Sequence, residues 1–171
     1  MFRSLAGRPD ARELFAAPNK AVGVVNDALA AGNDSCMFVT LLLATLDMRS
    51  GQLIYVRAGH VPPFHRTGDD AIARLIGVGG PPLGLVKGFD YRQDSVTLSP
   101  SDRLLVVTDG FTEANDPQSE LFGEARIETF MADANAPGSR SLPHLVRQVH
   151  EFEAGRPAFD DKAAILLTVN T

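Results

Sequence analysis

Apolar side chains recur at helical spacing in three parts of the chain. Over residues 19–31 the repeat includes Val22 and Val25, and a Gly-Asn-Asp-Ser stretch follows it. Repeats of this period predict amphipathic helices, and glycine directly after the last apolar position predicts a helix end. Two further repeats predict helices over residues 124–134 and 142–153. The three segments would each bury one face.

Five other segments are rich in apolar and β-branched residues and predict strands. Residues 37–47 and 52–58 are separated by a short turn and predict a β-hairpin, and three more strands are expected over residues 91–98, 103–108 and 163–169. The segment over residues 37–47 is apolar at nearly every position, which predicts burial on both of its faces.

Between residues 60 and 88 the chain is dense in glycine and proline, which favours short strands and turns over long elements. Strands and helices therefore occur in blocks and not in strict alternation, which predicts the α+β class. The chain has 171 residues, without an internal repeat or a dividing linker. We expect a single domain over residues 1–171.

Composition narrows the classes of function. No apolar run is long enough for a membrane span or a signal peptide, so a cytoplasmic protein without a membrane partner is expected. The net charge is −5 and the basic residues are scattered, which argues against a nucleic-acid partner. The one cysteine, Cys36, has no disulfide partner within the chain and is expected to lie in a strand.

Two places combine a buried strand with carboxylates. Asp109 and Gly110 follow the strand over residues 103–108, and Asp160 and Asp161 precede the last strand. Carboxylates at the ends of rigid strands are suitable ligands for Mg or Mn, and glycine would let the backbone come close to an ion. The alternative is that both places are ordinary turns.

Ordered motifs along the chain resemble the PPM-type, metal-dependent serine/threonine protein phosphatases, in their bacterial SpoIIE-like branch. The motifs are Phe38-Val-Thr-Leu, Gly51-Gln-Leu-Ile-Tyr-Val, Ala58-Gly-His with Pro62-Pro63, Pro82-Leu-Gly-Leu, Asp102-Arg-Leu-Leu, Thr108-Asp-Gly-Phe-Thr-Glu-Ala, Glu120-Leu-Phe-Gly and Asp160-Asp161. Each motif is weak, but their order and spacing together are specific.

The resemblance implies an antiparallel β-sandwich flanked by helices and a site for two Mn or Mg ions. Asp109 matches the aspartate of the family's Thr-Asp-Gly motif and Asp160 that of its late Asp-Asp motif, so both are expected as metal ligands. Gly110 and Asp161 are candidates for backbone or supporting contacts. No catalytic residue beyond the metal ligands is expected, because the ions activate the water that attacks the phosphorus.

The chain departs from the family at its beginning. It has no Gly-Gly-Asp-Phe-Tyr-Asp-like strand motif, which would supply the aspartate that bridges both ions. We therefore expect a PPM-type domain that is incomplete at the N-terminus and represents the C-terminal two-thirds. Strands that lose partners in this way would expose apolar edges, which invites association, with a homodimer as one form of it.

The expected function is a phosphoserine/phosphothreonine protein phosphatase. By resemblance its substrate would be a phosphorylated regulator, such as an anti-sigma-factor antagonist in a partner-switching pathway, or a protein of a two-component pathway. The alternative is a phosphatase-derived binding module without catalysis, because the dimetal site would lack ligands.

Several other polar residues allow narrower expectations. His60 is expected to order a turn by hydrogen bonding, whereas His65, His144 and His150 are expected at the surface. Lys162 could pair with Asp161 or a phosphate, but an exposed lysine is the favoured interpretation.

Thr112 and Glu113 follow the first aspartate motif closely. They could orient metal-bound water or cap the turn, and the residues alone do not decide between these roles.

Overall fold

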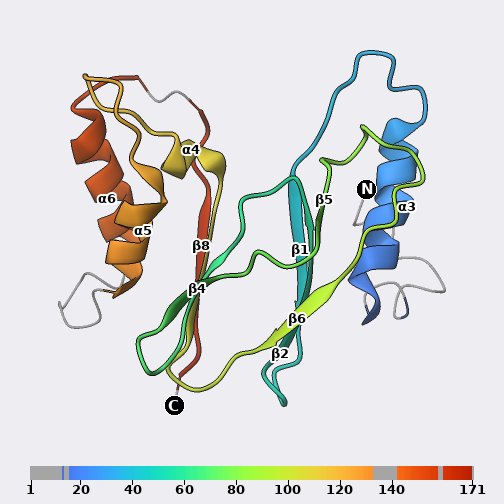
Figure 1. Ribbon diagram of the computed structural model, residues 1–171, viewed down its shortest axis with the longest axis horizontal. Coiled ribbons are helices and arrows are strands. Elements are labelled where there is room, and N and C mark those ends of the chain that lie inside the picture. Colours follow the sequence, from blue (N-terminus) through green and yellow to red (C-terminus); the bar gives the residue numbers. More distant parts are fainter. Residues whose placement is uncertain (1–12, 14–15, 133–141, 158–159, 171) are drawn as a thin grey trace. The chain divides into compact units, whose positions relative to one another are not determined.

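A computed structural model describes residues 13, 16–132, 142–157 and 160–170, and they belong to two compact units (Figure 1). The first unit falls within residues 1–60 and 76–98, and the second within residues 61–75 and 99–171. Each unit has its own sheet and its own apolar core. The single domain over residues 1–171 stays a prediction.

The first unit contains one described helix and a four-stranded sheet. Its elements are α3 (Pro18–Ala30), β1 (Leu41–Leu46), β2 (Gln52–Ala58), β5 (Gly79–Gly80) and β6 (Asp94–Thr97). Strand β2 pairs antiparallel with β1 and β6 and parallel with β5. The predicted hairpin is confirmed, and its register places Leu41 opposite Ala58 and Leu46 opposite Leu53.

Helix α3 lies against this sheet and supplies part of the core of the first unit. Val22 and Val25 are buried with Val56 of β2, as the helical spacing predicts. Pro18 occupies the first turn, where its fixed φ suits the helix and its missing N–H costs nothing. The helix ends at Ala30, one residue before the predicted end.

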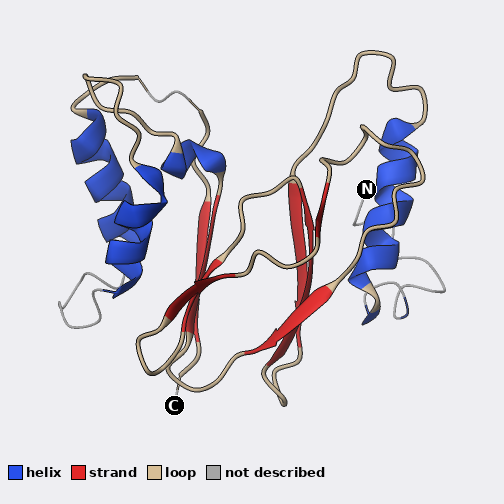
Figure 2. Cartoon of the chain, viewed as in Figure 1, coloured by secondary structure: helices blue, strands red, loops and turns tan. Residues whose placement is uncertain are grey.

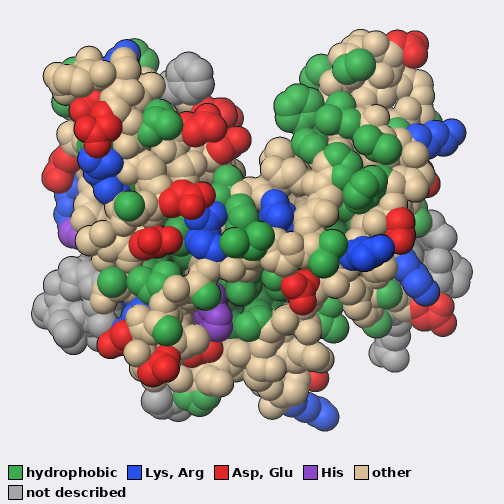
Figure 3. Space-filling model, in the orientation of Figure 1, with side chains coloured by type: hydrophobic (Ala, Val, Ile, Leu, Met, Phe, Trp, Pro, Cys, Tyr) green, Lys and Arg blue, Asp and Glu red, His purple; other side chains and the backbone are tan. Residues whose placement is uncertain are grey.

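Three predictions for β1 and the residues before it are wrong. Residues 37–40 lie outside the strand, and Met37 and Phe38 are 72% and 58% exposed. Strand β1 itself is only partly buried, because among the described strands it pairs with β2 alone and lies at an edge. Cys36 is exposed with a φ of 52° and belongs to no strand. Figure 3 shows apolar side chains gathered on the surface of this unit.

The second unit has a four-stranded antiparallel sheet in the order β4-β3-β7-β8 (Figure 2). The strands are β3 (Phe64–Arg66), β4 (Ile72–Arg74), β7 (Arg103–Val107) and β8 (Ala164–Thr168). Its helices are α4 (Asp109–Thr112), α5 (Gly123–Ala132) and α6 (Leu142–Glu153). The predicted bounds of α6 are confirmed, and β3 and β4 are the short strands expected in the glycine- and proline-rich segment.

The core of this unit lies between the sheet and its helices. Phe64 of β3 and Leu105 of β7 are fully buried against Ile127 of α5 and Leu145 of α6. Each such side chain contributes about 1.5–3 kcal/mol by leaving water. Strand β7 is buried at four of its five residues, so it is a rigid support for whatever follows it.

The α+β class is confirmed by two mainly antiparallel sheets, each packed against helices. Among the described helices, none is both long and apolar enough to cross a membrane.

Candidate metal centre

The threonine that ends β7 joins this strand to the segment before β8. The Thr108 hydroxyl donates a hydrogen bond to the carbonyl oxygen of Asp161 at 3.0 Å and accepts one from the N–H of Ala163 at 3.0 Å. The Thr108 N–H also donates to the Ala163 carbonyl at 3.0 Å. These bonds bring the two predicted aspartate motifs to the same end of the sheet.

Asp109 is the first residue of α4, not part of a free glycine turn. Its side chain is exposed, whereas Phe111, two residues later, is buried in the core of the second unit. The Thr112 hydroxyl donates to the Asp109 carbonyl at 3.0 Å, so it closes the turn of α4. This bond supports the second of the two expected roles of Thr112, which is to cap the turn. Asp109 therefore begins a turn that is fixed by the buried Phe111 side chain and by the hydrogen bond from Thr112.

Gly110 is required by a close approach of two backbones. A Cβ atom at this position would lie 2.5 Å from the Asp161 carbonyl oxygen and 3.3 Å from that of Asp160. Contacts this short do not occur for real Cβ atoms, so a larger residue would push the two segments apart. The sequence predicts that this glycine lets another part of the backbone come close. In the structure that part is the second aspartate motif, Asp160-Asp161.

Asp160 and Asp161 are exposed like Asp109. Asp160 Oδ1 accepts a hydrogen bond from the Asp161 N–H at 2.7 Å, and Asp109 Oδ1 accepts one from the Gly110 N–H at 3.1 Å. Each of these carboxylates keeps further acceptor positions for a ligand. Their oxygens are the donors that Mg and Mn prefer.

The carboxylate oxygens are ligands of the type that a divalent ion prefers, but there are too few of them for a complete site. Within the described ranges, no three acidic, histidine or cysteine side chains come together as a group that could hold a metal. A dinuclear site needs more ligands than the Asp109 and Asp160 carboxylates provide.

Lys162 is neither exposed nor paired with Asp161, so these two expectations for it are wrong. Its Nζ lies 2.7 Å from Glu153 Oε1, and the two side chains are 18% and 7% exposed. Because Glu153 ends α6, this ion pair ties the helix to the segment before β8.

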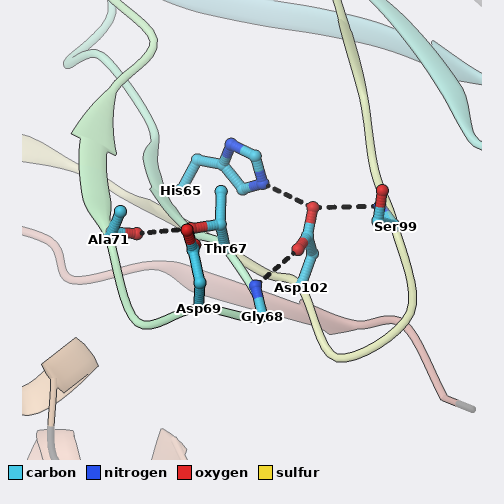
Figure 4. Close-up of polar contacts among 7 residues, drawn as sticks. All are labelled: His65, Thr67, Gly68, Asp69, Ala71, Ser99 and Asp102. Carbon is cyan, nitrogen blue, oxygen red and sulfur yellow. Dashed lines mark hydrogen bonds and ion pairs between the residues drawn. The ribbon is translucent and has the colours of Figure 1, made fainter.

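His65 is also not at the surface. His65 is 5% exposed, and its Nε2 lies 2.9 Å from Asp102 Oδ2 (Figure 4). The Asp102 carboxylate accepts two more hydrogen bonds, from the N–H groups of Ser99 and Gly68, at 2.9 Å each. Burial raises the pKa of Asp102, but these hydrogen bonds outweigh it and hold the pKa below its ordinary value of 3.8. This carboxylate is therefore buried and hydrogen-bonded within the fold, in contrast to the exposed Asp109 and Asp160.

His60 follows a glycine that packs against a proline. Gly59 has a φ of 68°, and a Cβ there would lie 2.6 Å from Pro82 Cγ. The His60 carbonyl accepts a hydrogen bond from Arg57 Nη1 at 3.1 Å, so its backbone helps to order this turn. Of the remaining histidines, His150 is exposed as expected and His144 is partly buried.

Comparison with known proteins assigns this chain to a family. Residues 1–170 match the family described as stage II sporulation protein E (SpoIIE). The chain belongs to the SpoIIE family. This family and its structural neighbours are PP2C-type serine/threonine phosphatases, which confirms the resemblance seen in the sequence motifs.

Two relatives of this SpoIIE-family chain are similar in sequence. Protein IcfG of Synechocystis sp. is 36% identical over 152 residues, which cover 88% of the chain and 24% of the relative. Phosphoserine phosphatase RsbU of Bacillus subtilis is 29% identical over 96 residues, covering 56% of the chain and 29% of the relative. The chain thus spans less than a third of either relative.

Solved structures confirm the fold class. The SiaA-PP2C domain of Pseudomonas aeruginosa superposes with a TM-score of 0.80 at 20% identity, covering 99% of the chain and 66% of that domain. RsbX in complex with magnesium has a TM-score of 0.62 at 14% identity, covering 96% of the chain and 69% of that protein. The α+β arrangement of antiparallel sheets and helices is therefore that of PP2C phosphatase domains.

Sequence reasoning missed the bonding role of Thr108 and the pairing of His65 with Asp102. A signal for the first is the position of the threonine directly after a buried strand, where its hydroxyl can reach a neighbouring backbone. A signal for the second is weaker, because nothing in the spacing of the two residues indicates contact.

Proposed function

We propose that this chain carries part of the metal centre of a Mn- or Mg-dependent phosphoserine/phosphothreonine protein phosphatase. Asp109 and Asp160 are the proposed ligands, and Gly110 and Asp161 support them through backbone contacts. The observation that carries the proposal is that the Thr108 hydroxyl bonds to Asp161, which fixes both aspartate motifs at one end of the sheet. Membership of the SpoIIE family supports it.

The chemistry of such a centre explains why exposed carboxylates are needed. Two bound divalent ions would lower the pKa of a water molecule and stabilise negative charge on the phosphoryl oxygens. The part of this chain is to hold oxygen ligands in place. The Phe111 anchor and the close packing at Gly110 restrict how far the Asp109 backbone can move.

The proposed substrate is a phosphorylated regulatory protein, such as an anti-sigma-factor antagonist of a partner-switching pathway. Similarity to RsbU, named a phosphoserine phosphatase, supports the phosphoserine part of this proposal. A cytoplasmic location without nucleic-acid or membrane partners, and association into a homodimer, stay predictions.

A second candidate is a binding module without catalysis. It is favoured by the number of ligands, since the described residues provide no group of three donors. The two candidates differ in a single measurable property, which is metal-dependent hydrolysis.

The experiment measures metal binding and phosphate release in the same preparation. Calorimetry with MnCl₂ should show weak binding, with a dissociation constant in the high micromolar range. The affinity for Mn should fall about 10- to 100-fold in Asp109→Asn. In a chain that also supplies the remaining metal ligands, phosphate release from a phosphoserine peptide should require Mn or Mg and stop in chelator.

The matched control is Asp90→Asn, which removes the same charge from an exposed aspartate in the first unit. It should bind Mn as the unaltered chain does. Tight Mn binding that survives in Asp109→Asn would refute the ligand assignment. Metal binding without phosphate release would favour the binding module.

A further inference from the structure

A polar cavity lies in the second unit, at the opposite end of β7 from Asp109. Its volume is about 540 Å³, and its described lining includes Arg66, Arg103, Ser101 and Asn170. None of the described residues that line it is acidic. It is thus distinct from the aspartate centre in both position and charge.

The register of the sheet places two arginines and a threonine in one row. Arg66 of β3 is opposite Arg103 of β7, which is opposite Thr168 of β8. Directly opposed residues of antiparallel strands project from the same face of a sheet, so the two guanidinium groups and the hydroxyl belong to one surface. Arg66 is 7% exposed and Arg103 is 4% exposed.

Arg66 is only partly satisfied within the fold. Its Nη2 forms an ion pair with Asp70, whose side chain is 66% exposed. Its Nε is buried and has no hydrogen-bond partner among the described residues. A buried charged donor without an acceptor is costly, so an acceptor from outside would be favourable here.

The acidic group on the turn before β7, Asp102, is not available to these arginines. Asp102 directs its carboxylate to His65, Gly68 and Ser99 (Figure 4). The same bonds hold the turn that carries Ser101, whose N–H donates to the Val169 carbonyl at 2.9 Å. The cavity therefore has a fixed rim and a positive lining.

We propose that this cavity binds a phosphoryl group. Guanidinium forks match the oxygens of phosphate, and the hydroxyls of Ser101 and Thr168 with the Asn170 amide can donate further hydrogen bonds. Free phosphate and a phosphomonoester such as phosphoserine share this chemistry. The proposal does not depend on the proposed phosphatase activity, because it involves none of the aspartate ligands.

The test is calorimetry in the presence of EDTA, which removes metal-dependent binding, with inorganic phosphate and O-phospho-L-serine as separate probes. We expect at least one probe to bind and Arg66→Gln to weaken that binding about 10-fold or more. Tighter binding of O-phospho-L-serine would indicate a phosphomonoester site, and equal or tighter binding of phosphate would indicate a site for the free ion.

Two controls separate binding from folding. Arg74→Gln removes an arginine of the same sheet that contacts Phe64 of β3 and Glu124 of α5 but does not line the cavity, and it should leave the affinity unchanged. Asn170 is exposed at the rim, so its charge variants should fold. Asn170→Asp should weaken binding and Asn170→Lys should strengthen it.

The proposal is overturned if neither probe binds in EDTA, or if Arg66→Gln and Asn170→Asp both bind as the unaltered chain does. Asp109→Asn should retain the binding. This variant separates failure of this proposal from failure of the proposed metal centre.

Discussion

The two ends of β7 place the same residue type in opposite environments. Asp102 directly precedes the strand, is 3% exposed, and accepts hydrogen bonds from three groups of the fold. Asp109 follows the strand after one residue, is exposed, and its one described side-chain hydrogen bond is to its neighbour Gly110. A buried strand thus carries a structural carboxylate at one end and an available one at the other.

The difference teaches how a structural aspartate can be separated from a candidate ligand. Internal donors stabilise the charged Asp102 and leave it no accessible acceptor position for an ion. Asp109 has a rigid backbone and a free carboxylate, which is the combination that a ligand site requires. Stability should therefore depend on the first residue, and metal binding on the second.

The largest expected effect on stability is that of Asp102→Asn. It removes a buried charge that interacts with His65 and puts an amide where donors converge, so we expect a loss of about 3 kcal/mol in the free energy of unfolding. Urea denaturation measures this loss. A loss below 1 kcal/mol, with an unchanged denaturant slope, would contradict the structural role.

Gly110→Ala should cause the next largest loss of stability. The added methyl group meets the backbone carbonyl of Asp161 at 2.5 Å, so the two segments must separate at a cost of about 2 kcal/mol. Metal affinity should fall together with stability, since Asp109 and Asp160 move apart. Gly23→Ala is the control, because a Cβ there meets nothing within 4 Å. Equal stability of both variants would show that the backbones are not in close contact.

The pH dependence of stability, which arises from Asp102 and its contact with His65, should be a smaller effect. Because the pKa of Asp102 is lowered in the folded state, its contribution is fully present above the ordinary value near 3.8 and is lost as the pH falls through the folded value. Unfolding free energies measured from pH 6 to pH 2 should decline at the acid end. The curves for the unaltered chain and Asp102→Asn should converge there. Parallel curves would contradict the assignment.

The smallest effect on stability should be that of Asp109→Asn. An exposed side chain with one local hydrogen bond contributes within about 0.5 kcal/mol. The melting temperature should therefore stay close to that of the unaltered chain, although Mn affinity falls. A large loss of stability would mean that Asp109 is a structural residue like Asp102, and the contrast between the two ends would disappear.

Much of the fold could be predicted from local patterns. The helical spacing around Val22 and Val25 identifies α3, and the continuous apolar run at residues 104–107 identifies β7. Burial of one face leaves a periodic pattern in the sequence, and burial of both faces leaves a continuous apolar run. The same kind of pattern gave a wrong prediction of burial for β1. An apolar run predicts that a strand is buried, but it does not show which element would cover the strand.

The candidate site was predictable only in its parts. Asp109 and Asp160 were indicated by their positions beside buried strands and by the family resemblance. That their motifs lie together depends on Thr108, which bonds to a carbonyl 53 residues later. Such pairing is a property of strand order, which no local pattern contains.

The sequence by itself determined the class of the fold and the family, and it indicated the candidate metal ligands, because these follow from periodicity and ordered motifs. Only the tertiary structure decided which polar residues are occupied. His65 and Asp102 are 37 residues apart and pair inside the fold, and Lys162 turns to Glu153 instead of the aspartate beside it. The physical reason is that a carboxylate is characterised by the donors that reach it, and packing alone brings those donors together.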